Sequence, residues 1–166
     1  MVRSCIVWGA CLLALSCGSV EPGATPVVEP DVVSVELGIP AGDGLDFAPI
    51  KDGDELYVQT FGQGGTHVLV GVRCLGFGSR AFISAELTNL STGVQVEEPA
   101  PARPQLLYCT EGGPCDLVPY LVHTSGLVPS GVKGAGVHAR LRIKARTEAG
   151  LQAEGEREVL LNTSNL

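Results

Sequence analysis

Residues 137–161 have the sequence VHARLRIKARTEAGLQAEGEREVLL. Over residues 137–146 apolar residues alternate with His, Arg and Lys, which is the pattern of a β-strand with one buried face. A three-residue loop at 148–150, with Gly150 left-handed, is expected to return the chain as a second strand. The register of this hairpin sets opposite charges side by side, Lys144 with Glu154, Arg142 with Glu156 and Arg140 with Glu158. A slip of one residue would bury these charges, so the charge pattern itself specifies the register.

The same register places Arg157 beside Leu141 on the apolar face of the hairpin. We therefore expect Arg157 to lie at an edge or to extend its guanidinium toward solvent. On the other face, the row of basic residues could bind an anionic polymer. Because acidic residues stand opposite, a neutralised and solvated face is the preferred interpretation.

Two-residue alternation recurs along the chain between turn signals rich in Gly, Asp and Ser, and no segment has apolar residues at helical spacing over three turns. The pattern predicts an all-β fold, an antiparallel β-sandwich of immunoglobulin-like architecture with about eight or nine strands. Strand order cannot be read from it. The expected strands are residues 32–37, 55–60, 66–75, 81–90, 94–97, 105–108, 117–122, 137–146 and 152–161.

The N-terminus is typical of an export signal. Residues 1–16 (MVRSCIVWGACLLALS) combine one Arg with an apolar run too short to span a bilayer, and we interpret them as a signal peptide. Residues 17–30, rich in Gly, Pro and Glu, are expected to be a flexible tether. Residues 31–166 then form the β-sandwich domain.

Cys17 directly after the small residue Ser16 resembles the processing site of bacterial lipoproteins, in which the Cys is acylated. That pattern has Leu three residues before the Cys, whereas this chain has Ala14 there and Leu13 one position earlier. The resemblance implies lipidation of Cys17 and a membrane partner. Gly18, where Asp would signal inner-membrane retention, favours the outer membrane. The alternative is an ordinary secretory signal with an incidental Cys.

Composition excludes some partners. The formal net charge of −7 argues against nucleic-acid binding, which requires a basic surface. Aromatic residues make up only 5% of the chain, which disfavours the exposed ring platforms used for sugars and single-stranded nucleic acids.

Beyond the signal region the cysteines are Cys17, Cys74, Cys109 and Cys115. Exported thiols tend to pair, and the sequence between Cys109 and Cys115 can turn sharply enough to bring their sulfur atoms together. A Cys109–Cys115 disulfide with Cys74 as a buried thiol is the first prediction. The alternative pairs Cys74 with one of the other two across the sheets.

No catalytic arrangement is recognisable. No Ser lies in a G-x-S-x-G turn, nothing in the local sequence suggests a nucleophile held beside its base, and we expect no enzyme activity and no cofactor. For metals, only a weak calcium hypothesis arises, because carboxylates from two loops could converge. Its residues are Asp43, Asp46, Asp52 and Asp54.

Residues 61–73 (FGQGGTHVLVGVR) are the most distinctive stretch. With residues 56–59 (LYVQ) and 87–93 (LTNLSTG), they resemble uncharacterised lipoproteins of myxobacteria that carry Gly-Pro-Gln-Gly-Gly-x-His before a strand ending in Arg. This chain lacks the residue between Gly62 and Gln63. The resemblance covers about residues 53–96 and implies location and fold but no activity. Gln63, His67 and Arg73 are candidates for a partner surface, and the alternative is that Gln63 and His67 only stabilise the turn.

The sequence thus predicts a non-catalytic envelope lipoprotein, a tethered β-sandwich that binds or scaffolds an envelope protein or polymer. The alternatives are an envelope hydrolase with a site built from loops and a calcium-dependent adhesion module.

Overall fold

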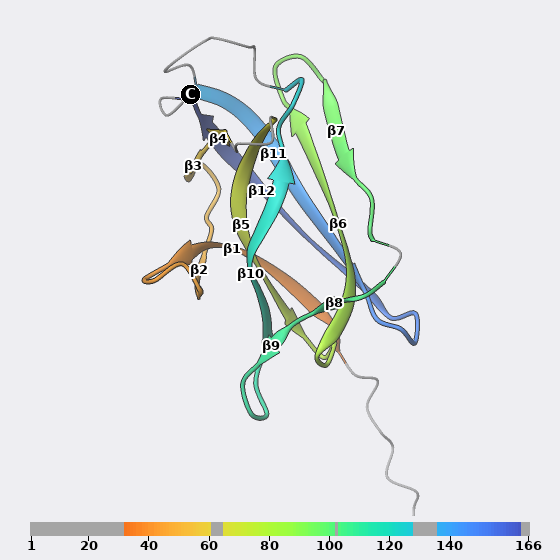
Figure 1. The fold of residues 1–166 in the computed structure, drawn as a ribbon. Helices are drawn as coiled ribbons and strands as arrows, with labels where there is room; N and C mark the ends of the chain where they lie inside the picture. Colours follow the sequence, from red (N-terminus) through yellow and green to blue (C-terminus); the bar gives the residue numbers. More distant parts are fainter. Residues whose placement is uncertain (1–31, 61–64, 102, 128–135, 164–166) are drawn as a thin grey trace, which may run out of the picture. The chain divides into compact units, whose positions relative to one another are not determined.

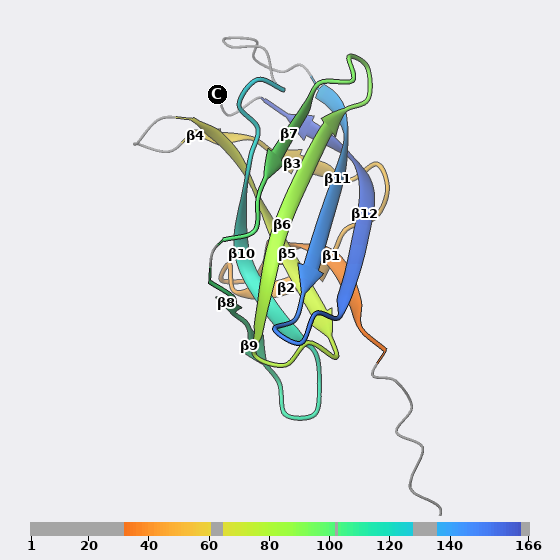
Figure 2. The same ribbon diagram turned by 90° about the vertical axis from the view of Figure 1, so that its right-hand side faces the viewer.

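The structure is a computed structural model, and it describes residues 32–60, 65–101, 103–127 and 136–163. In these ranges the chain folds into two six-stranded β-sheets packed face to face, with no helix (Figures 1 and 2). The predicted all-β sandwich is confirmed. The predicted signal peptide and tether, with Cys17, lie outside the described residues, as does Gln63. None of the described segments is a helix long and apolar enough to cross a membrane.

The first sheet has the order β2-β1-β5-β10-β9, and β4 also pairs with β5. Its pairs are all antiparallel. The strands are β1 (Ser34–Ala41), β2 (Asp46–Pro49), β4 (Gln59–Thr60), β5 (Thr66–Leu75), β9 (Tyr108–Cys109) and β10 (Cys115–His123).

The second sheet has the order β3-β12-β11-β6-β7, and β8 also pairs with β6. Its pairs are antiparallel except that β3 runs parallel to β12. The strands are β3 (Glu55–Tyr57), β6 (Arg80–Asn89), β7 (Gln95–Glu98), β8 (Gln105–Leu106), β11 (Gly136–Arg146) and β12 (Gln152–Asn162).

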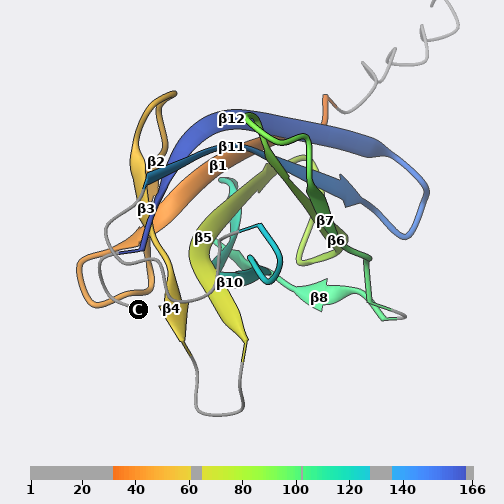
Figure 3. The same cartoon turned by 90° about the horizontal axis from the view of Figure 1, so that it is seen from above.

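Strand order, which the sequence left open, follows the immunoglobulin arrangement. The orders β1-β5-β10-β9 and β12-β11-β6-β7 correspond to strands A-B-E-D and G-F-C-C′ of that fold. Figure 3 shows the two layers from above, with β5 and β10 facing β6 and β11 across the core.

The core lies between the layers and is built by alternation. On β5, Val68, Val70 and Val72 are fully buried, and on β11 so are Leu141 and Ile143. Successive side chains of a strand point to opposite faces, so each strand contributes every second residue to the core.

The β11–β12 hairpin has the predicted register, with Arg140 opposite Glu158, Arg142 opposite Glu156 and Lys144 opposite Glu154. Gly150 has a positive φ of 91°, as the loop requires. The N–H of Thr147 donates to the carbonyl of Leu151 at 2.9 Å and closes the loop.

Two predicted strands are each divided between the sheets, which corrects the prediction. The segment predicted as 55–60 changes sheet at Val58, giving β3 and β4, and the segment 105–108 changes sheet at Leu107, giving β8 and β9. Both residues are buried, with Val58 at 0% and Leu107 at 3% exposure. The chain crosses at an apolar residue because that side chain fills the core between the layers.

β2 is a strand that the sequence analysis did not predict. It folds across the outer face of the first sheet, where the Phe47 ring lies against the backbone of Gly38 and Gly71. A Cβ at Gly71 would be 2.9 Å from Cδ2 of Phe47, so only glycine leaves room for the ring.

Candidate functional site

His67 and Arg73, predicted as a partner surface, lie on the face of β5 opposite to the buried valines, where His67 is buried and Arg73 is partly buried. His67 is only 8% exposed and stands opposite His123 of β10, with ring centroids 4.0 Å apart. Burial lowers the pKa of His67, the nearby His123 lowers it further, and Glu98 acts in the opposite direction. A side chain this enclosed adds little to a contact surface.

Arg73 is held within the domain on two sides. Its Nε and Nη2 each donate to a carboxylate oxygen of Asp116 at 2.9 Å, and its guanidinium lies 4.1 Å from the centre of the Phe47 ring. The hydrogen bonds and the charge of Asp116 raise the pKa of Arg73. The two hydrogen bonds to Asp116 join β5 to β10, and the contact with Phe47 holds β2 against them. The guanidinium of Arg73 is therefore used in contacts within the domain.

The four aspartates of the calcium hypothesis do not converge. No three His, Cys, Asp or Glu residues within the described ranges are grouped so that they could hold a metal ion. Three of the four cap backbone N–H groups instead, Asp43 that of Leu45, Asp54 that of Lys51 and Asp52 that of Glu158. Asp43 and Asp54 satisfy donors within their own turns, as Asp side chains often do, whereas Asp52 accepts from β12.

The loop that carries Asp52 and Asp54 also covers the edge of β12. The N–H of Gly53 donates to the carbonyl of Glu158, and the N–H of Leu160 donates to that of Asp54. Arg157, expected at an edge or near solvent, donates from Nε to the carbonyl of Ile50 at 3.1 Å. The guanidinium of Arg157 therefore satisfies a backbone carbonyl beside the edge of β12 and does not enter the core.

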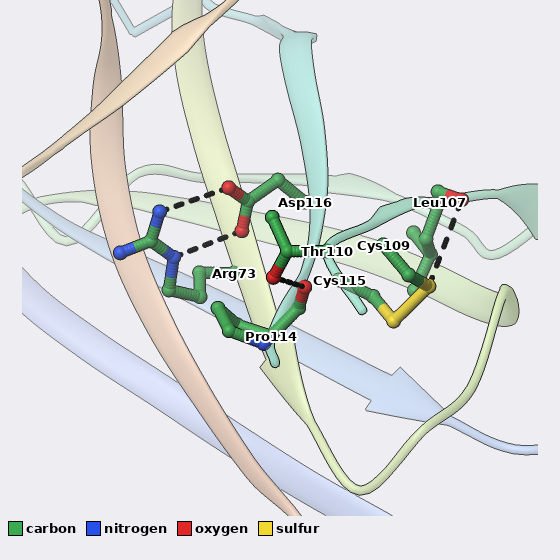
Figure 4. Close-up of a disulfide and its surroundings, with 7 residues drawn as sticks. All are labelled: Arg73, Leu107, Cys109, Thr110, Pro114, Cys115 and Asp116. Atoms are coloured by element: carbon green, nitrogen blue, oxygen red, sulfur yellow. Dashed lines mark hydrogen bonds and ion pairs between the residues drawn. A yellow bond between two sulfur atoms is a disulfide. The ribbon is translucent and has the colours of Figure 1, made fainter. Parts of the chain in front are cut away.

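Figure 4 shows the predicted disulfide between Cys109 and Cys115. Its S–S distance is 2.08 Å. Cys74 is a buried free thiol. The first prediction for the cysteines is confirmed, and the alternative pairing of Cys74 is not the one present.

The outer face of the second sheet carries the basic residues of β11 in lateral rows. In each row a cation on β11 lies between one residue of β6 and one of β12. From one end of the strand to the other, the rows are Thr88–Arg140–Glu158, Glu86–Arg142–Glu156, Ser84–Lys144–Glu154 and Phe82–Arg146–Gln152.

Three of the four cations have carboxylate partners. Arg140 lies 3.2 Å from Glu158 and 3.2 Å from Glu156, and Arg142 lies 2.7 Å from Glu156. Lys144 Nζ is 3.8 Å from Glu86. The predicted neutralised face is therefore present, although Lys144 pairs with Glu86 of β6 and not with Glu154, which stands opposite it.

Arg146 differs from the other three because its row contains no acid. Its guanidinium lies 4.4 Å from the centre of the Phe82 ring, and no ion pair to it occurs among the described residues. Gln152 stands opposite it on β12. This end of the sheet thus keeps an exposed guanidinium with no carboxylate in its own row.

A hollow of about 400 Å³ opens at this end of the face. A second hollow of about 180 Å³ adjoins it and shares Ser84, Ala100 and Lys144. The larger one is lined by Phe82, Ser84, Ala100, Lys144, Ala145, Arg146, Gln152, Ala153 and Glu154. The hollow therefore offers aromatic surface, hydroxyl and amide groups and two cations to one ligand group, with the carboxylate of Glu154 at its lining as well.

Sequence reasoning did not select Arg146, Phe82 or Ser84 as site residues. The pairing of β6 with β11 joins residues about sixty positions apart, so no local sequence pattern predicts it. One signal was present, since the hairpin register alone shows that Arg146 is the cation opposite a neutral residue.

The comparisons with known proteins return little. No protein-family model matches the chain, and no curated protein matches it. Among solved structures, the CooA pilin subunit from enterotoxigenic Escherichia coli aligns with a TM-score of 0.39 at 10% sequence identity, over 81% of this chain and 99% of that one.

Proposed function

We propose that this protein is an exported, lipid-tethered β-sandwich that binds a carboxylate-bearing peptide segment on the outer face of its second sheet, without catalysis. The observation that carries the proposal is the row Phe82–Arg146–Gln152, in which the guanidinium lies beside a hollow with no carboxylate adjacent in its row. The anchor rests on Cys17 and the lipoprotein-like signal before it.

A carboxylate is the group that this row fits. Arginine offers parallel N–H donors that match both oxygens of a carboxylate, and such charge-assisted hydrogen bonds are stronger than neutral ones. The Phe82 ring fixes the guanidinium plane from one side and leaves its other edge for a ligand. Lys144, more than half exposed, and the side chains of Ser84 and Gln152 supply further donors at the hollow.

The same face argues against an extended polyanion. Arg140 and Arg142 are already paired with glutamates, so repeated negative charge along β11 would meet Glu156 and Glu158. The site accordingly suits one or two carboxylates presented at the Arg146 end.

Binding is tested with a labelled peptide that carries two adjacent glutamates and with its counterpart that has glutamines at those positions, by fluorescence anisotropy at low salt with the full chain in detergent. Wild-type protein should bind the acidic peptide and not the neutral one. Arg146→Gln should weaken binding by roughly 10- to 100-fold, the effect of losing one charge-assisted contact.

The matched control is Arg140→Gln, which removes the same charge from the same strand and face but from a neutralised row. It should change the affinity by no more than about twofold, because exposed ion pairs contribute little. Equal loss in both variants would show that only net charge matters, and equal binding of both peptides would refute carboxylate recognition.

The anchor is tested separately. Incorporation of labelled palmitate and mass analysis of the mature N-terminus should show an acylated Cys17, and Cys17→Ala should abolish both signals. Unacylated protein released to the medium in both versions would refute the tether while leaving the binding test intact.

A further inference from the structure

Three cysteines lie in one row across the first sheet. Cys115 of β10 is the register partner of Cys74 on β5 and, on its other side, of Cys109 on β9. Directly opposite residues in antiparallel strands have Cα atoms about 4.5–5.5 Å apart, a separation that a disulfide between Cys74 and Cys115 could span. In the bonded pair Cys109–Cys115 the Cα atoms are 3.9 Å apart. The sulfur of Cys115 can therefore be reached from either side.

The three side chains differ in exposure. Cys74 is fully buried and Cys115 is 5% exposed, whereas Cys109 lies at the surface beside the exposed loop of residues 110–114. With the Cys109–Cys115 bond in place, the free thiol is the buried one. The alternative bond between Cys74 and Cys115 would leave the surface cysteine as the free thiol.

We propose that these residues form a thiol–disulfide exchange set that converts a buried thiol at Cys74 into a surface thiol at Cys109. The thiolate of Cys74 attacks Sγ of Cys115, a Cys74–Cys115 bond forms, and the Cys109–Cys115 bond breaks. Cys109 leaves as a thiolate and takes up a proton equivalent to the one Cys74 gave up, so no oxidant or reductant is consumed. Cys74 attacks from the β5 side of Cys115 and Cys109 leaves on the β9 side, because the two cysteines flank Cys115 in the row.

Burial determines when the exchange occurs. It raises the pKa of the Cys74 thiol to about 12, and the charge of Asp116 adds to the effect, so the attacking thiolate is scarce at neutral pH. The neighbouring Arg73 forms an ion pair with Asp116 at 2.9 Å. Alkaline conditions or local opening at the short strand β9 should allow the exchange to proceed. The exposed Cys109 thiolate can then attack an external disulfide.

This inference is independent of ligand binding at Arg146 and is tested by peptide mapping. Trypsin cleaves after Arg73, Arg80 and Lys133, so Cys74 lies in peptide 74–80, while Cys109 and Cys115 share one peptide because Pro104 blocks cleavage after Arg103. The Cys109–Cys115 bond is therefore internal to one peptide, whereas a Cys74–Cys115 bond joins two.

The full chain is incubated at about pH 7 and about pH 10 with oxidised glutathione, then quenched with acid. At the higher pH we expect the two-peptide species with glutathione on Cys109, forming about tenfold faster for each pH unit. Cys74→Ser is the control and should give no glutathione at Cys109. An internal Cys109–Cys115 bond that persists at both pH values, or equal labelling in Cys74→Ser, overturns the proposal.

A second pair of variants removes the dependence on pH. In Cys109→Ser, the freed Cys115 should form a bond with Cys74 on mild oxidation by glutathione disulfide. In Cys115→Ser, the flanking Cys74 and Cys109 should not pair, because a strand separates them. Glutathione on Cys115 with Cys74 left free in Cys109→Ser would show that the two sulfur atoms do not meet, and would overturn the proposal.

Discussion

The ring of Phe47 on β2 lies over the backbone of Gly71 on β5, and the guanidinium of Arg73 covers the same ring at 4.1 Å. A Cβ at Gly71 would approach Cδ2 of Phe47 to 2.9 Å and Cγ2 of Val118 to 3.3 Å. The contact adds to the pairing of the four-residue strand β2 with β1 and holds it against β5.

Gly71→Ala should therefore destabilise the domain by about 1–3 kcal/mol through overpacking, measured as the free energy of unfolding in urea. The same substitution in a Phe47→Ala background should cost much less, since the obstructing ring is gone. Equal costs in the two backgrounds would place the effect elsewhere than at this contact.

Arg73→Lys should destabilise the domain although it keeps the charge. Lysine cannot make the two parallel hydrogen bonds to Asp116 at 2.9 Å or stack flat on Phe47, and the loss should be about 1 kcal/mol in urea denaturation because the pair is partly exposed. Arg80→Lys, at an exposed position, is the matched control and should change stability little. A lysine variant as stable as wild type would mean that charge alone suffices.

Gly150→Ala should weaken the β11–β12 hairpin, because the φ of 91° is unfavourable for any residue with a Cβ. Space is not the cause, since no heavy atom lies within 4 Å of the added carbon. The expected loss is about 1–3 kcal/mol in the free energy of unfolding. Ala149→Ser in the same loop should be close to neutral, and similar losses in both variants would contradict the argument.

His67 should make stability depend on pH. Its pKa is lowered in the folded chain by burial and by His123, against the opposing effect of Glu98, so the unfolded chain binds a proton more readily. The contribution is present above the ordinary histidine pKa of 6.5 and is lost as pH falls through the lower folded value.

We therefore expect the melting temperature of the wild type to fall between about pH 7.5 and about pH 5.5. In His67→Gln that fall should be smaller, and in His138→Gln, at an exposed position, it should equal that of the wild type. Identical pH profiles for wild type and His67→Gln would show that the buried imidazole does not set the dependence.

The β11–β12 hairpin shows how much of the structure the local sequence pattern can predict. Its register, its loop and the position of Gly150 were all predictable, because alternation and opposite charges within twenty-five residues exclude every competing pairing. The Cys109–Cys115 bond was predictable for a similar reason, since the turn between the cysteines is local. Anchoring through Cys17 stays a prediction from sequence.

Other features depend on contacts between distant segments. The residues that cover His67 and Arg73 could not be identified from sequence, because His123, Asp116 and Phe47 come from other strands. The change of sheet at Val58 and at Leu107 likewise depends on which layer has room for the next residue.

By itself, the sequence determined which side chains of β11 face the core, and the register of its last hairpin, because both follow from the two-residue period and from charges close along the chain. Tertiary structure alone decided the order of the strands, the placing of Phe82 beside Arg146 and the alignment of Cys74 with Cys115. Those relationships arise when sheets assemble from segments far apart in the chain. Backbone hydrogen bonds are the same for every pair of strands, so they do not specify which strands become neighbours.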